Sequence, residues 1–138
     1  MALVSPNLGE LELLDKMLKD ALSSDEDYIL KLYGNDYTPD DNSAEASFTE
    51  PVFTNYAART LTRAAWNDAV TISDKAETSY GTTPQSWTCG ATGDTVYGYY
   101  VTGATSGVVL WAERFATSRV LADGDILNLT PKFTLNKE

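Results

Sequence analysis

The sequence has no histidine and only one cysteine, Cys89, among its 138 residues. Zinc and haem sites of the familiar kinds draw ligands from these two residue types, so the chain has too few ligands for either. A nucleophilic serine or cysteine usually needs a histidine as its general base, and no Gly-x-Ser-x-Gly motif occurs. Glycine-rich nucleotide-binding motifs are missing too. We therefore predict a protein that is not an enzyme, with no catalytic residues, no cofactor and no metal.

Two chemical alternatives stay open at this point. Any two carboxylates can converge in a fold to form a glycosidase pair, although no pair stands out in the sequence. The oxygens of Asp36, Asp40, Asp41 and Asn42 could bind calcium, but their spacing does not match an EF-hand loop. We interpret that acidic stretch as a solvated turn.

Basic residues are scarce: 10 lysines and arginines face 20 aspartates and glutamates, which gives a net charge of −10. Most of the excess lies in residues 1–50, where twelve acidic side chains meet three basic ones. Binding to nucleic acid or to an anionic membrane depends on lysine and arginine, so we expect neither partner. The acidic front end is typical of a protein that must stay soluble.

Long apolar runs are absent as well. No stretch approaches the roughly 20 apolar residues that span a bilayer. The first ten residues, MALVSPNLGE, lack the basic and apolar regions of a signal peptide, so we expect a cytoplasmic site of synthesis. In that compartment Cys89 is predicted to be a buried structural thiol, with an intermolecular disulfide as the disfavoured alternative.

The first element that the sequence predicts is an amphipathic helix over residues 8–22. Asn7 stands in an N-cap position and Glu10 three residues later completes a capping box. Leu8, Leu11 and Leu14 begin an apolar stripe at helical spacing. The seven residues before the helix are predicted to form an N-terminal arm.

Residues 28–135 have a different composition, since all fifteen aromatic residues lie at or beyond Tyr28. Aromatic and β-branched residues favour strands, and short apolar runs here alternate with glycine-rich turns. Strands are expected at 28–33, 52–65, 69–73, 76–80, 85–89, 95–102, 108–115 and 125–135. We predict one domain with an antiparallel β-sandwich or jelly-roll-like barrel, and an exposed, mobile loop at 34–47.

The stretch YGYYVTGATSGVVLWAERF, residues 97–115, is predicted to be a hairpin near the centre of this body. Strict alternation would place Val96, Gly98 and Tyr100 on one face and Tyr97, Tyr99 and Val101 on the other. Gly98 among tyrosines indicates a bulge or a close approach of another backbone. The aromatic cluster is interpreted as core, and an aromatic subunit interface is the alternative.

Four segments carry a resemblance to known proteins: MALVSPNLGELELLDKMLKDAL, YILKLYGNDYTPD, GYYVTGATSGVVLWAERF and LADGDILNLTPKFTL. Together they resemble a family of small virion-associated proteins of tailed bacteriophages, over nearly the whole chain. The resemblance implies a non-enzymatic capsid decoration or cement protein that binds the outer surface of the shell and stabilises it. Its partner would be the major capsid protein, and no catalytic residue carries over.

This role leads to further expectations. A homotrimer would suit the local symmetry of a capsid, and the virion would be assembled in the host bacterial cytoplasm. Leu3, Val4 and Pro6 of the N-terminal arm are predicted to contact the capsid and to become ordered on docking. The alternatives are a neck or tail adaptor, and a receptor- or glycan-binding virion component. The glycan-binding alternative would rely on exposed rings, for which Tyr37, Trp66 and Trp87 are the candidates.

Overall fold

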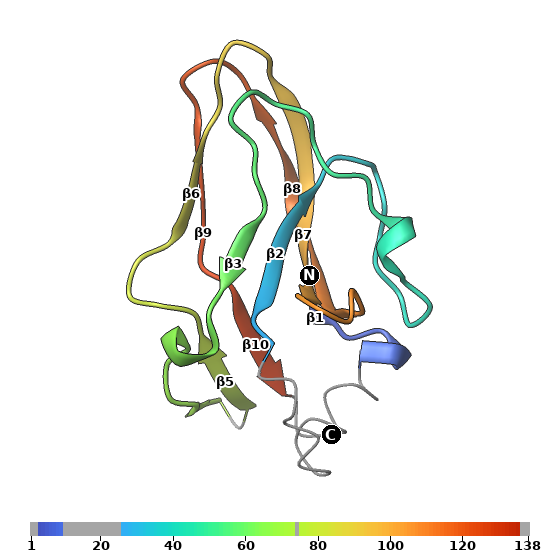
Figure 1. The fold of residues 1–138 in the computed structure, drawn as a ribbon, viewed down its shortest axis with the longest axis vertical. Coiled ribbons are helices and arrows are strands. Elements are labelled where there is room, and N and C mark those ends of the chain that lie inside the picture. The colour runs from blue at the N-terminus through green and yellow to red at the C-terminus, as the bar shows by residue number, and fades with distance from the viewer. Residues whose placement is uncertain (1–2, 10–25, 74, 136–138) are drawn as a thin grey trace.

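The structure is a computed structural model, and it describes residues 3–9, 26–73 and 75–135 (Figure 1). The described residues form antiparallel sheets with two short 3-10 helices, η1 (Glu45–Ser47) and η2 (Arg63–Ala65). The prediction of a mainly β fold is confirmed. Residues 7–9 are helical, but the rest of the helix predicted over 8–22 lies outside the described residues.

The largest sheet has five strands, and its centre is a long antiparallel hairpin. In spatial order the strands are β1 (Leu3–Val4), β8 (Val109–Leu121), β7 (Asp94–Gly103), β2 (Tyr28–Tyr33) and β3 (Arg59–Leu61). The expected hairpin of residues 97–115 is therefore present, and its second strand runs six residues further than predicted.

Two smaller sheets complete the described fold. One contains β10 (Lys132–Leu135), β5 (Lys75–Ser79) and β4 (Val70–Ile72), and the other pairs β6 (Gln85–Thr88) with β9 (Ile126–Leu129). Residues 125–135, predicted as one strand, are divided at Pro131 between these two sheets. Proline lacks the amide proton that a continuous ladder would use, so the strand ends there.

The predicted strand at 52–65 is mostly wrong, because only Arg59–Leu61 is extended and paired. Phe53 is buried and Tyr56 packs against it, with ring centroids 5.4 Å apart. The backbone amide of Tyr56 donates to the carbonyl of Phe53 in a turn. Two core side chains three residues apart fit a turn and not the two-residue period of a strand.

One face of the five-stranded sheet lies on a core to which all three sheets contribute. Leu30, Val101 and Trp111 come from the large sheet. Trp87 and Leu127 come from the β6–β9 pair, and Phe133 of β10 packs against the cluster. This shared core links the two smaller sheets to the large one.

The other face of the large sheet is covered by the segment of residues 34–50. Phe48 is buried there against Tyr33 and Tyr100. Asp36 forms an ion pair with Arg114 of β8, and Glu45 forms one with Lys31 of β2. The predicted exposed loop is thus tied to the sheet by aromatic packing at its end and by ion pairs along it, although most of its own side chains are exposed.

Gly98 changes which face the side chains of β7 occupy. The β7–β8 register shifts between Val96 and Gly98, so the prediction of a bulge is confirmed. Val96, Tyr99 and Val101 consequently share the main core, while Tyr100 points to the opposite face. The strict alternation expected for residues 96–101 was wrong, because a bulge reverses the order of faces on one side of it.

Candidate functional site

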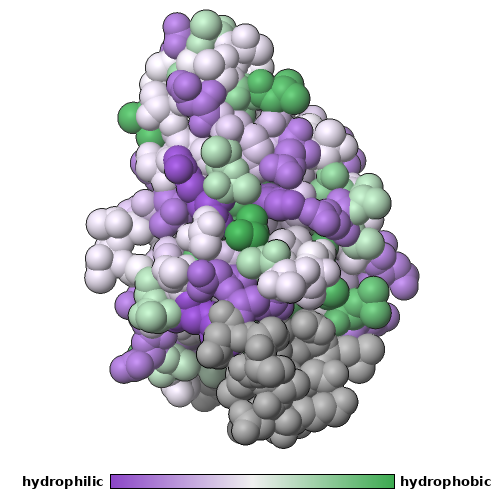
Figure 2. Space-filling view, viewed as in Figure 1, coloured by the Kyte–Doolittle hydropathy of each residue, from purple (hydrophilic) through white to green (hydrophobic). Residues whose placement is uncertain are grey.

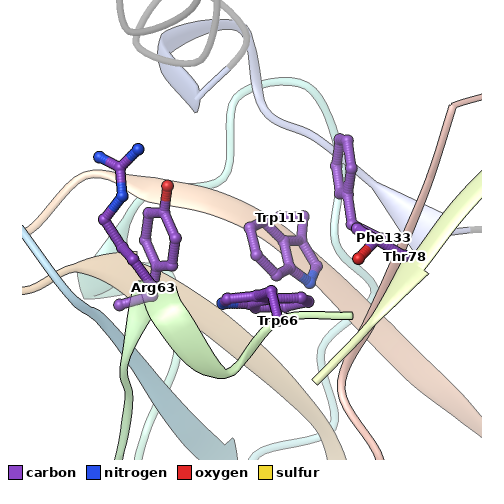
Figure 3. A pocket seen from close by; sticks show the side chains of 6 residues that line it. Arg63, Trp66, Thr78, Trp111 and Phe133 are labelled. Atoms are coloured by element: carbon purple, nitrogen blue, oxygen red, sulfur yellow. The ribbon is translucent and has the colours of Figure 1, made fainter. Parts of the chain in front are cut away.

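An aromatic pocket of about 260 Å³ lies where the small β10–β5–β4 sheet meets the large one (Figure 3). We call it the tryptophan pocket. Its lining residues come from β2, η2 and the residue after it, β5, β8 and β10: Tyr28, Arg63, Trp66, Thr78, Trp111 and Phe133. These side chains are far apart in the sequence and meet only because the small β10–β5–β4 sheet lies against the end of the large one.

The walls of the tryptophan pocket are held by an edge-to-face and a tilted ring contact. The centroids of Trp66 and Trp111 are 5.8 Å apart with an interplanar angle of 72°. Those of Trp111 and Phe133 are 5.0 Å apart at 52°. Such contacts favour one arrangement of the rings, and Trp111 is only 3% exposed. The pocket therefore has a preformed shape.

The lining of the tryptophan pocket is mainly aromatic. Figure 3 shows Arg63 at one side of the two indole rings and Thr78 with Phe133 at the other. No carboxylate or thiol is among the described lining residues, so they provide no acid–base pair. The hydroxyl of Thr78 already donates to the carbonyl of Asn67 at 2.7 Å, so the aromatic walls suit an apolar side chain or small molecule.

Several buried tyrosines are the titratable groups with the largest shifts. Tyr99 donates a hydrogen bond of 2.9 Å to Glu113, and Tyr56 donates one of 2.6 Å to Glu50. Burial, and then the nearby carboxylate, raises the pKa of each of these phenols. Burial raises the pKa of Tyr33 to about 12. These phenols stay protonated at neutral pH as hydrogen-bond donors: Tyr99 links β7 to β8, and Tyr33 donates to the carbonyl of Tyr37 in the segment that covers the sheet.

Glu26 is a buried carboxylate at the start of β2, with 7% exposure. Its Oε2 accepts hydrogen bonds from the backbone amides of Thr105, at 2.6 Å, and Ser106, at 3.0 Å. These residues form the turn between β7 and β8, where amides would otherwise lack partners. The glutamate thus anchors the turn of the central hairpin.

Two of the three residues predicted to contact a capsid form the edge strand β1, and the third, Pro6, follows it. Leu3 and Val4 form β1, and they pair with Glu113 and Ala112 of β8. Both are half-buried, and Leu3 packs against the main core. Pro6 is fully buried. The structure places all three together at one edge of the large sheet, and whether they meet a partner stays a prediction.

The rings proposed for glycan binding do not form one surface. Trp87 is 1% exposed, and its Nε1 donates to the carbonyl of Ala57 at 2.8 Å. Tyr37 packs edge-on against Phe48, and Trp66 lines the tryptophan pocket. Because Trp87 is in the core, the expectation of an exposed ring at this position was wrong.

Cys89 is buried, as the sequence predicted, with 1% exposure. Its Sγ lies 3.4 Å from the carbonyl oxygen of Gly90. In the acidic stretch, Asp40 accepts hydrogen bonds from the amide of Asn42 and the hydroxyl of Ser43, as in an Asx turn. Within the described ranges no three metal-binding side chains gather.

Sequence reasoning identified Trp66 but missed Thr78 and Phe133 as members of one pocket. Each lies on a strand of a sheet whose pairing the sequence does not reveal, so only a correct strand order would have found them. No protein-family model matches the chain, and neither does any curated protein. No described helix has the length and apolar character needed to cross a membrane.

Proposed function

We propose that this protein is a non-enzymatic structural component of a tailed-bacteriophage virion, specifically a capsid decoration or cement protein on the outside of the shell. The observation that carries the proposal is the burial of aromatic side chains in residues 97–115. In this stretch Tyr99, Tyr100 and Trp111 are buried on the two faces of one hairpin. This supports a role that depends on a rigid shape rather than on reactive groups.

The proposal includes the finer architecture, an antiparallel β-sandwich with one N-terminal helix. Its support is the shared core, in which the β6–β9 pair and β10 contribute side chains opposite the large sheet. A rigid sandwich with an acidic surface can be present at high copy number without aggregating. Self-association as a homotrimer and binding to the major capsid protein belong to the same proposal.

The surface is compatible with a soluble, high-copy component. On the face in Figure 2, hydrophobic side chains occur in small separate groups among polar ones. Seven large hydrophobic side chains are exposed among the described residues: Leu8, Val52, Val70, Ile72, Val120, Ile126 and Leu135. Scattered apolar side chains are normal at a protein surface, whereas broad patches drive association.

Quantitative mass spectrometry of purified particles tests the assignment. A copy number close to that of the major capsid subunit is the expected result. A copy number typical of a portal or tail ring would instead support an adaptor. Absence from the particle would refute the structural role altogether.

The predicted contact through the N-terminal arm has its own test. Deletion of residues 1–6 is expected to weaken binding to shells that lack the protein. Because this deletion also removes β1 and the buried Pro6, the melting temperature must be measured alongside. Loss of binding without loss of folding supports the contact, and unchanged binding excludes it.

A further inference from the structure

Two hollows join into one groove between β8 and β9, away from the tryptophan pocket. Their volumes are about 460 and 430 Å³. Residues 113–121 of β8 form one wall, and residues 125–128 at the start of β9 form the other. Arg119, Leu127 and Asn128 line both hollows, so we treat them as a single β8–β9 groove.

Among the residues that the structure describes, both walls of the groove include strand edges that are largely unpaired. The outer edge of β8 is paired by β1 only at Ala112 and Glu113. Within the described part of the chain, β9 pairs with β6 alone. Unpaired strand edges offer rows of amide and carbonyl groups to an added strand.

The bulge at Gly98 also interrupts the pairing of β8 with β7 beside the groove. Gly98 of β7 pairs with Arg114, and Val96 pairs with Arg119, so residues 115–118 of β8 have no partner on β7. Ala116 and Thr117 in this interval are exposed. Bulges of this kind often end a strand pairing beside a binding site.

Four charged side chains line the groove: Glu113, Arg114, Arg119 and Asp125. Glu113 accepts a hydrogen bond from Tyr99, Asp125 accepts one from the amide of Ala122, and Arg114 pairs with Asp36. Lys31, Arg114 and Lys132 each form an ion pair with a carboxylate. No carboxylate in the ranges that the structure describes forms an ion pair with the exposed Arg119. In a chain with a net charge of −10, an arginine left in this state is available to an external acid. Two exposed apolar side chains stand beside it, Val120 at 75% and Ile126 at 59% exposure.

We infer that the β8–β9 groove is a docking site for an extended, acidic segment of a partner protein. The segment would add a strand along the edge of β8, place a carboxylate on Arg119 and rest apolar side chains on Val120 and Ile126. Main-chain hydrogen bonds would provide affinity, and the charge pair would select the register and the partner. The inference does not depend on the virion assignment.

The test is a selection from a phage-displayed random dodecapeptide library on the full-length protein, with counter-selection on Arg119→Glu. Peptides that alternate apolar and polar residues and contain aspartate or glutamate are expected. Their synthetic versions should bind Arg119→Glu at least about tenfold more weakly than the unchanged protein. Exchange of the peptide's acid for lysine should restore binding to Arg119→Glu.

Two controls separate strand addition from simple charge attraction. Lys132→Glu changes the net charge equally but lies on β10, outside the groove, and should leave the affinity within about twofold. Methylation of alternate peptide amides should abolish binding, because it removes the main-chain donors. Amide chemical-shift changes should fall in residues 113–121 and 125–128.

Three results would overturn the inference. The selection could yield no peptide that prefers the unchanged protein over Arg119→Glu. The shift changes could map to the tryptophan pocket. Finally, light scattering could show that the protein alone forms an oligomer that Arg119→Glu dissociates, which would assign the groove to a second copy.

Discussion

The ring of Phe48 lies parallel to the ring of Tyr100, with centroids 4.4 Å apart and an interplanar angle of 12°. Phe48 belongs to the segment 34–50, and Tyr100 belongs to β7 at the centre of the large sheet. Stacking between them closes the second face of the sheet, which would otherwise expose several aromatic rings. The segment is thus a structural cover for a strand pair that is buried on both sides.

Replacement of Phe48 by alanine is expected to lower the free energy of unfolding by about 3–5 kcal/mol, since it leaves a cavity against Tyr33 and Tyr100. Urea denaturation followed by tryptophan fluorescence measures the change. Val52→Ala is the control, because Val52 is 77% exposed and should change the stability by less than about 0.5 kcal/mol. Equal effects of the two substitutions would contradict the covering role.

Gly98 is expected to tolerate no side chain. A Cβ atom there would lie 2.2 Å from the carbonyl oxygen of Glu113 and 2.6 Å from the hydroxyl of Tyr33. Gly98→Ala should therefore cost at least about 2 kcal/mol or prevent folding, because a backbone oxygen cannot move away cheaply. Gly124→Ala serves as the control. The φ angle of Gly124 is +86°, but no atom lies within 4 Å of an added Cβ, so a loss of stability of about 1 kcal/mol is expected. Thermal unfolding measures the loss of stability in both variants. A smaller loss for Gly98→Ala than for Gly124→Ala would contradict the prediction.

The buried phenols should make the protein sensitive to alkali. The pKa of Tyr33 is raised by burial to about 12, whereas an unfolded tyrosine titrates near 10. Tyr56, Tyr99 and Tyr100 are shifted in the same direction. Since the unfolded state releases these protons first, their contribution is complete below pH 10 and is lost as the pH rises toward 12.

Stability should fall by up to about 1.4 kcal/mol per pH unit for each shifted tyrosine in that range. Urea midpoints at several alkaline pH values measure this slope, and tyrosinate absorbance measures the titration. Tyr33→Phe should remove one phenol from the late-titrating group. If all tyrosines ionised near pH 10 while the near-ultraviolet circular dichroism stayed native, the proposed burial would be refuted.

Cys89 should be unreactive in the folded protein. It is 1% exposed, and burial followed by the nearby Asp123 carboxylate raises the pKa of its thiol. The thiolate is the reactive form, so labelling with Ellman's reagent should wait for unfolding and be immediate in urea. The matched control moves the thiol by one residue to an exposed position, in Thr88→Cys combined with Cys89→Ala. Fast labelling of native Cys89 would contradict the buried position.

Most of the secondary structure followed from local composition. Five of the expected strands, β2, β4, β5, β6 and β7, have both ends within one residue of the prediction, and β8 runs six residues further. Aromatic and β-branched runs bounded by turns leave few alternatives. The prediction for residues 52–65 was wrong, because the apolar side chains Phe53 and Tyr56 pack on the core from a turn and not from a paired strand. The tryptophan pocket could not be predicted from the sequence, because Trp66, Thr78 and Phe133 share no spacing that would mark them as neighbours.

The sequence by itself determined a mainly β fold, a buried thiol at Cys89 and a break in regularity at Gly98, because each depends on residue type and nearest neighbours. Tertiary structure decided which faces are buried, since one bulge reverses the alternation of β7 and long-range packing places residues 34–50 over the sheet. It also decided that β8 and β9 separate after their turn and leave a groove at Arg119. Strand order is a matter of contacts between distant segments, and local periodicity does not encode those contacts.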